Sequence, residues 1–111
     1  MVRLAGIALM LTFEKELKAA LLRAGVLPSE LPQTLENLVV RAYRFEDSDQ
    51  LQRIALAARK GDLLGHSGHR NRATHGDRFT LVDLEKVAQL LLTDGLDGKG
   101  LIGLLVRSRR G

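Results

Sequence analysis

The three histidines of the chain lie close together, and imidazole is the side chain that most often binds metals or transfers protons near neutral pH. His66, His69 and His75 form an H-x2-H-x5-H series, with Asp62 and Asp77 nearby. Three imidazoles and a carboxylate can fill a zinc site, and an open position would allow hydrolysis. However, the spacing matches no established zinc signature, and a glycine-rich loop holds ligand geometry poorly. We therefore predict a solvated polar loop, with no metal site and no cofactor, and keep a histidine-dependent metallohydrolase as the least favoured alternative.

Motifs for other catalytic chemistry are absent from the sequence. There is no Gly-x-Ser-x-Gly and no phosphate-binding Gly-x4-Gly-Lys-Ser/Thr. Ser67 lies between two histidines, but a triad needs partners oriented in space, which adjacency in the sequence does not provide. Asp94 and Asp97 resemble part of a calcium loop without its twelve-residue ligand series and terminal glutamate. The sequence thus predicts no enzymatic activity and no catalytic residue.

Basic side chains gather around the histidines and at the end of the chain. Residues 53–78 hold six lysines and arginines against two acids. The first 98 residues are balanced, so the whole net charge of +4 comes from the last thirteen residues, which contain no acid. Arginines and glycine amides suit phosphates. The candidate nucleic-acid-binding residues are Arg59, Lys60, Arg70, Arg72, Arg78, Arg107, Arg109 and Arg110.

Nucleic-acid binding is nevertheless the alternative function and not the first choice. Aromatic side chains, on which single-stranded bases stack, make up only 4% of the chain. A helix-turn-helix built from residues 32–61 would place Gln50, Gln52 and Arg53 at the base-reading end, but the required turn length is only roughly met. The arginines of residues 53–78 are also explained by a hydrated loop in which they form ion pairs with the acidic residues of 46–49.

Apolar residues recur at three- and four-residue spacing in four segments, which predicts amphipathic helices. These helices are expected near residues 12–25, 32–45, 47–61 and 80–95. Thr12 is the expected N-cap of the first, and Asp47 with Gln50 and Thr80 with Asp83 are expected capping boxes. The residues expected to face the core are Phe13, Leu17, Ala20, Leu21, Ala24, Leu35, Leu38, Val39, Ala42, Leu51, Ile54, Ala55, Ala58, Leu81, Leu84, Val87, Ala88, Leu91 and Leu92, with Tyr43 as a further candidate on the second helix.

Two segments lack such a pattern. Residues 65–79 have no apolar periodicity and predict a loop, and long loops in compact domains tend to be functional or mobile. The apolar run 101–106 is compatible with a helix or with a buried strand. The sequence therefore predicts an all-α fold, a small bundle of four to six short helices with a Gly/His/Arg-rich loop at about 65–79.

A chain of 111 residues with 45% apolar and 27% charged residues has the size and composition of one globular domain. We expect a single helical domain over residues 1–111, with an apolar N-terminal segment at 1–11 and a basic tail at 107–111. The sequence contains no cysteine, which fits a reducing compartment. Segment 1–11 lacks a clear cleavage pattern and is too short to span a membrane. The predicted location is the cytoplasm.

The two ends of the chain carry more apolar residues than one small core is expected to cover, and exposed apolar patches usually mark interfaces. The candidate interface residues are Leu4, Ile7, Leu9, Leu101, Ile102 and Leu105. Together with the missing catalytic motifs, they predict a non-catalytic helical interaction module. Such a module would act as an adaptor, a small subunit of a complex or a self-assembling domain, with another protein or a second copy as its partner.

Overall fold

The computed structural model of the chain describes residues 2–64, 68–75 and 78–108, which form six α-helices and two short helical turns. In chain order the elements are α1 (Val2–Arg23), η1 (Pro28–Glu30), α2 (Leu35–Tyr43), α3 (Asp49–Lys60), α4 (His69–His75), α5 (Leu81–Ala88), η2 (Gln89–Thr93) and α6 (Leu101–Ser108). No strand occurs over these ranges. The predicted all-α bundle is confirmed.

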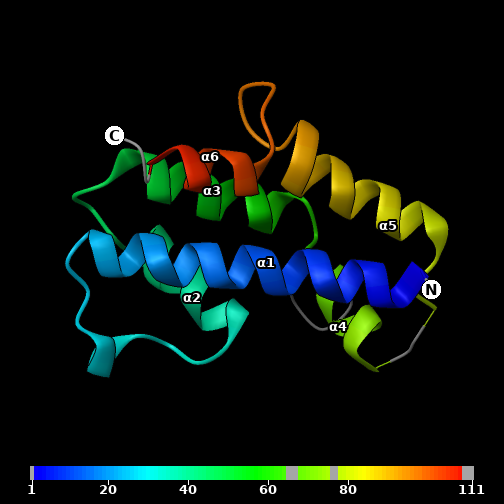
Figure 1. Cartoon of the computed structure of the whole chain (residues 1–111), viewed down its shortest axis with the longest axis horizontal. Coiled ribbons are helices and arrows are strands. Elements are labelled where there is room, and N and C mark those ends of the chain that lie inside the picture. Colours follow the sequence, from blue (N-terminus) through cyan, green and yellow to red (C-terminus); the bar gives the residue numbers. More distant parts are fainter. Residues whose placement is uncertain (1, 65–67, 76–77, 109–111) are drawn as a thin grey trace.

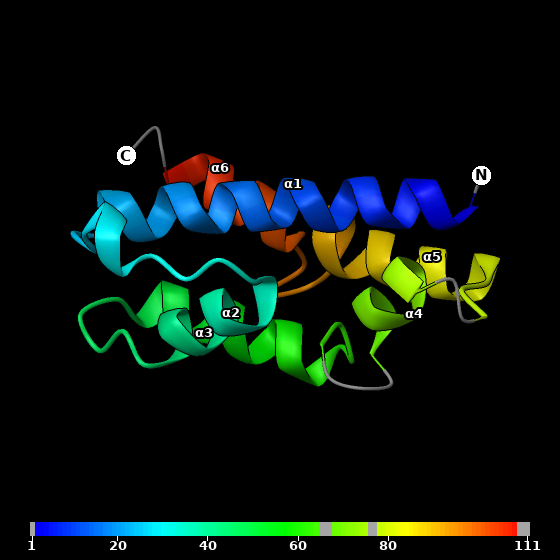
Figure 2. The same cartoon turned by 90° about the horizontal axis from the view of Figure 1, so that it is seen from below.

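Helix α1 lies at the centre of the bundle (Figure 1), where α2, α4, α5 and α6 all pack against it. Helices α4 and α5 lie at the N-terminal end of α1, and α6 lies along its other half. Figure 2 shows α2 and α3 side by side in a layer beneath α1. None of the helices described is long and apolar enough to cross a membrane.

The expected break between an apolar segment 1–11 and a helix capped by Thr12 is not present, because α1 runs unbroken from Val2 to Arg23. Thr12 lies inside the helix, and its hydroxyl donates a hydrogen bond of 2.9 Å to the carbonyl of Ala8. A threonine in a helix commonly makes this bond to the preceding turn. Residues 4–11 are mostly leucine, alanine and methionine, which favour helix over a capped break.

The predicted helix starts are confirmed in part. Thr80 and Asp83 form the expected capping box: the amide of Asp83 donates to the Thr80 hydroxyl at 3.3 Å, and the amide of Thr80 donates to the Asp83 carboxylate at 2.9 Å. Helix α3 is capped by Ser48, not by the predicted pair of Asp47 and Gln50, and α2 is capped by Thr34. The residues predicted to form the inner faces of α2 and α3 are buried except Tyr43, at the end of α2, which is 43% exposed.

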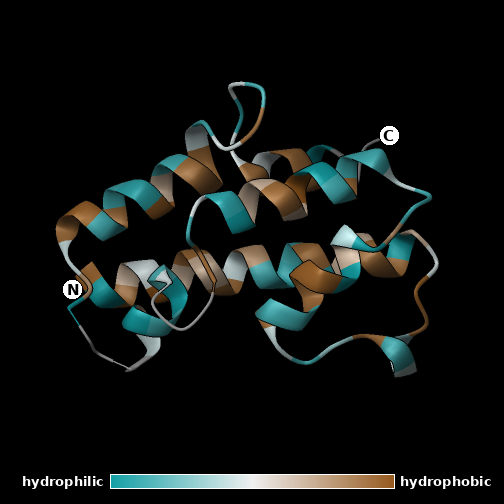
Figure 3. Cartoon of the chain, turned by 180° about the vertical axis from the view of Figure 1, so that it is seen from behind, coloured by the Kyte–Doolittle hydropathy of each residue, from teal (hydrophilic) through white to brown (hydrophobic). Residues whose placement is uncertain are grey.

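The helix predicted at 80–95 changes its hydrogen bonding part of the way along. After α5 the chain forms one π-helical turn, η2, which ends where the amide of Asp94 donates to the carbonyl of Gln89 at 2.6 Å. Val87 and Leu91 are buried as predicted, but Leu81 and Leu92 are exposed, contrary to prediction. Figure 3 shows hydrophobic and hydrophilic bands alternating along α5. The apolar run 101–106 belongs to helix α6.

The expected loop at 65–79 contains the short helix α4, so this part of the prediction is wrong; residues 65–67 and 76–77 lie outside the described residues. The sequence gives no periodic signal here because Ala73 is the one buried apolar residue in α4. Polar contacts hold the helix in its place. The Arg3 side chain, about 70 positions away in the sequence, donates to the carbonyls of Ala73 (2.6 Å) and Thr74 (3.1 Å) at its C-terminal end.

The neighbouring residues Leu91 and Leu92 allow a matched test of this core. Leu91 is fully buried and Leu92 is 52% exposed. Leu91→Ala is expected to lower the free energy of unfolding by ~2–5 kcal/mol, because it removes buried methyl groups and leaves a cavity. Leu92→Ala is expected to change it by less than ~0.5 kcal/mol, as surface substitutions usually do. Urea unfolding measures both values, and equal effects would contradict this packing.

Candidate functional site

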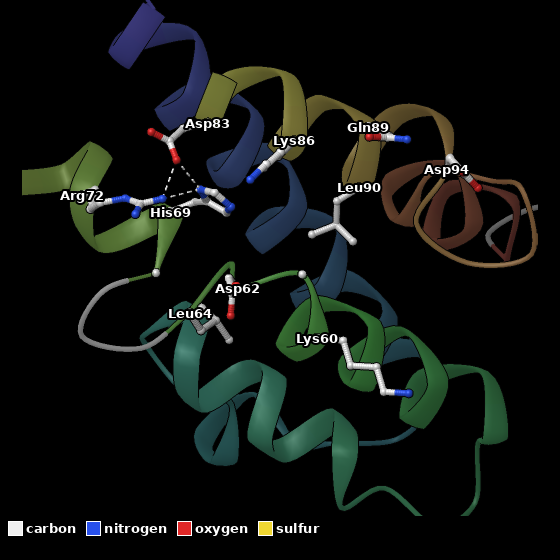
Figure 4. A pocket seen from close by; sticks show the side chains of 12 residues that line it. Lys60, Asp62, Leu64, His69, Arg72, Asp83, Lys86, Gln89, Leu90 and Asp94 are labelled. Atoms are coloured by element: carbon white, nitrogen blue, oxygen red, sulfur yellow. Dashed lines mark hydrogen bonds and ion pairs between the residues drawn. The ribbon is translucent and has the colours of Figure 1, made fainter. Parts of the chain in front are cut away.

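The strongest polar cluster among the described residues joins α4 to α5. His69 begins α4, Arg72 follows one turn later on the same face, and Asp83 lies in the first turn of α5. The Nδ1 atom of His69 lies 2.9 Å from a carboxylate oxygen of Asp83, and the guanidinium group of Arg72 forms an ion pair with the same oxygen. Figure 4 shows the three side chains converging.

Asp83 is the centre of this cluster. Its side chain is largely buried, and it accepts hydrogen bonds from the backbone and hydroxyl groups of Thr80 as well as from Arg72. Burial alone raises the pKa of Asp83, but the hydrogen bonds from Thr80 and the positive charge of Arg72 outweigh it, so the pKa lies below its ordinary value of 3.8. Asp83 is therefore a fixed carboxylate at neutral pH.

His69 is one of the few buried polar side chains described. Burial lowers its pKa below the ordinary value of 6.5, and the charge of Arg72 lowers it further, against the opposing effect of Asp83. His69 is therefore neutral at pH 7. Its Nδ1 atom lies 2.8 Å from Arg72 as well as 2.9 Å from Asp83, so it donates to the carboxylate or accepts from the guanidinium group according to its tautomer.

The cluster forms one wall of a cavity of about 590 Å³ between the end of α3, the start of α4 and one side of α5 (Figure 4). Its charged lining residues are Lys60, Arg72, Lys86, Asp62, Asp83 and Asp94. Three positive charges thus balance three negative ones. The lining residues described include no hydroxyl or thiol group that His69 could activate as a nucleophile. The cavity can hold a polar ligand, and its described lining offers lysine, carboxylate and imidazole groups but no hydroxyl or thiol.

The predicted histidine series is placed only in part. His69 lies in the cluster, His66 is outside the described residues, and for His75 only the backbone position in α4 is described. The described part of the chain contains no group of three or more side chains able to hold a metal ion. The expected lack of a metal site therefore stays a prediction.

The candidate nucleic-acid-binding residues do not share one described surface. Lys60 and Arg72 line the cavity of Figure 4, Arg59 lies over the ring of Tyr43, and Arg70 lines a separate small cavity beside α1. Arg78 and Arg107 are exposed, and Arg109 and Arg110 lie outside the described residues. The charge of Arg72 is moreover engaged by Asp83.

The candidate interface residues are divided between surface and core. Leu4 is 65% exposed, whereas Ile7 and Leu9 are partly buried against the core. The three residues of the C-terminal segment, Leu101, Ile102 and Leu105, are buried in the chain's own core. The excess apolar surface expected at that end is therefore absent, because α6 folds as a helix that packs on α1.

Sequence reasoning missed the cluster, although it had noted each of its members separately. The sequence presents Asp83 as a helix cap, His69 as a member of the histidine series and Arg72 as a candidate nucleic-acid-binding residue, each in a separate pattern. Their contact crosses 11 and 14 positions of the chain and depends on where α4 docks. No local spacing pattern reports it.

Comparisons with protein-family models, with curated proteins and with solved structures found no match for this chain.

Substituting Asp83 tests whether the cluster stabilises the fold. Asp83→Asn is expected to lower the free energy of unfolding by about 1–3 kcal/mol, because it removes the charge that pairs with Arg72 and weakens the capping box. Asp94→Asn is the matched control, since Asp94 lines the same cavity but is exposed. Chemical denaturation of both variants gives the comparison. Equal stability of the two would show that the cluster contributes nothing to folding.

The lowered pKa of His69 predicts a pH effect of definite sign. The unfolded chain takes up a proton on His69 near the ordinary value of 6.5, before the folded chain does. Stability from this residue is therefore complete above that pH and declines as the pH falls below it. Asp83 does not interfere, because its lowered pKa matters only near and below 3.8.

This effect is measured by urea unfolding of the unchanged protein and of His69→Gln at pH about 7.5 and about 5.5. The comparison isolates His69 because the other two histidines are present in both proteins. The loss of stability on acidification should be smaller in His69→Gln. The same loss in both proteins would contradict the assignment.

Proposed function

We propose that this protein is a non-catalytic helical interaction module that associates with a second copy of itself through the outer face of α1. The supporting observation is an exposed helix face without charge. Between Arg3 and Glu14 α1 carries no charged residue. Leu4 and Leu11 are 65% and 57% exposed. Surface helices normally present charged and polar residues to water, so this face is unusual.

The spacing along this face suits a helical partner. Leu4, Ala8 and Leu11 lie at positions i, i+4 and i+7, which place them on one side of the helix. The small side chain of Ala8 lets a second helix approach closely. An antiparallel pair of α1 helices with its two-fold axis between residues 7 and 8 sets Leu4 of one copy opposite Leu11 of the other, because the two positions are equally far from the axis.

We favour a second copy as the partner because the two-fold axis places an exposed leucine of one copy opposite an exposed leucine of the other at both ends of the contact. Residues 4–13 contain no charged side chain, so pairing of the two helices over this range buries no unpaired charge. Complete burial of a fully exposed leucine contributes ~1.5–3 kcal/mol, and Leu4 and Leu11, which are 65% and 57% exposed, contribute correspondingly less. Three turns of one helix give an interface at the low end of the usual range, below about 1,200 Å², so the association should be weak.

A structural role for the His69 cluster is supported by the contacts of Asp83, whose carboxylate is engaged by His69, Arg72 and Thr80 and so joins α4 to α5. Nucleic-acid binding remains the alternative function, and the separation of the candidate basic residues weighs against it. The cytoplasmic location stays a prediction from the missing cysteine.

Self-association is tested by replacing both exposed leucines. Size-exclusion chromatography with light scattering should find a dimer of the unchanged protein at micromolar concentrations. Leu4→Ser with Leu11→Ser should give a folded monomer, because the apolar contact is lost while the core is untouched. Ile7 and Leu9 are poor choices for this test because both also pack on the core.

The matched control is Leu81→Ser with Val82→Ser, which removes two equally exposed apolar side chains from α5. This variant should keep the mass of the unchanged protein. A monomer at every concentration of the unchanged protein would refute self-association and leave docking to a different protein as the form of the interaction function.

A further inference from the structure

A second surface, formed by α2 and α3, combines an exposed tyrosine with arginines. Tyr43 ends α2 and is 43% exposed, and Arg44 directly follows it. Arg59, in the last turn of α3, lies over the Tyr43 ring at 5.4 Å from its centroid. The side-chain amide of Gln52 donates to the Tyr43 carbonyl at 3.1 Å and so ties the end of α2 to α3. This surface is therefore built on two connected helices and not on a loop.

Two hollows lie on either side of Tyr43 and Arg44, which line both of them. The first has a volume of about 400 Å³ and includes Leu56, with Glu46 among its other lining residues. The second has a volume of about 440 Å³ and includes Val39, Val40, Leu64 and Glu36. Each hollow thus combines apolar side chains with a charged rim. That combination can accept the side chains of an extended segment.

The charges of this surface are available to a partner. Neither Arg44 nor Arg59 forms an ion pair with a carboxylate among the described residues, whereas nearby Arg53 pairs with Asp97 at 2.8 Å. Stacking on Tyr43 restrains the guanidinium group of Arg59, so less freedom is lost when it binds a carboxylate. Tyrosine and arginine are also the side chains that most often dominate binding energy at protein interfaces.

We infer that the surface centred on Tyr43 binds an acidic segment of another protein. Carboxylates of that segment pair with Arg44 and Arg59, and its apolar side chains enter the two hollows. This inference names a partner for the proposed interaction module, but it uses a different surface from α1. It also differs from nucleic-acid binding, because a single tyrosine supports little base stacking and the apolar side chains of the two hollows suit apolar side chains of a peptide, whereas Glu36 and Glu46 oppose both kinds of anionic partner alike.

Fluorescence anisotropy with a labelled synthetic peptide of Asp, Glu and Leu tests the inference, using the full chain at low salt. The control peptide has Asn and Gln in place of the acids. The acidic peptide should bind and the control peptide should not. Arg44→Gln with Arg59→Gln should weaken binding of the acidic peptide about tenfold or more, because charge-assisted hydrogen bonds from two guanidinium groups are lost.

The matched control is Lys15→Gln with Lys99→Gln, which lowers the net charge by the same amount at exposed positions outside both hollows. It should keep the affinity of the unchanged protein. Circular dichroism checks the fold of each variant, and the single variant Arg44→Gln, at an exposed position after α2, serves if the double variant is unfolded.

Several outcomes would overturn the inference. Equal weakening by the two double variants would show that only net charge matters. Binding of the amide control peptide, or no binding of the acidic one, would remove the proposed chemistry. Tighter binding of a single-stranded oligonucleotide that depends on Arg44 and Arg59 would assign the surface to nucleic acid. The variant Leu4→Ser with Leu11→Ser should still bind the acidic peptide, so failure of self-association through α1 is distinguishable from failure here.

Discussion

The buried face of α1 is the contact on which the other parts of the fold depend. Phe13, Leu17 and Leu21 are fully buried there, and α2, α4, α5 and α6 all pack on the same helix. At Gly6 the approach is so close that a Cβ atom would lie 2.5 Å from the ring of Phe79, just before α5. Because four helices cover one side of α1, only its opposite side faces water, and in residues 4–13 that side carries no charge.

Helix α4 depends on a different kind of contact. It buries one apolar side chain, so hydrophobic packing alone holds it weakly. Arg3 binds the carbonyls at its C-terminal end, and Asp83 engages His69 and Arg72 on its first two turns. Two charged side chains from α1 and α5 therefore position this helix. Elements with few buried apolar contacts open at a low free energy cost. The docking of α4 should therefore respond to protonation of His69, whose pKa burial lowers.

The sequence predicted those features that have a local cause. The inner faces of α2 and α3 are predicted by the spacing of their apolar residues. The capping box is predicted by Thr80 and Asp83, which lie three positions apart. The prediction for Leu92 failed because one π-helical turn at 89–93 changes the rotation per residue and carries its side chain to the surface. Helix α4 and its cluster were not predictable, because their contacts join residues 11 to 71 positions apart. The sequence predicted exposed apolar side chains at 101–106 because a local pattern does not show that α6 packs on α1.

The two surfaces that we propose for binding differ in physical character. The outer face of α1 offers leucine and alanine, and association there is driven by removal of apolar area from water, which salt does not screen. The surface around Tyr43 offers guanidinium groups that have no carboxylate partner among the described residues, and its attraction for carboxylates weakens as salt increases. A protein with both surfaces can keep its self-association while it releases an acidic partner. That separation follows from where the charges lie: none over residues 4–13, and two arginines without a carboxylate partner among the described residues, Arg44 and Arg59, on the other surface.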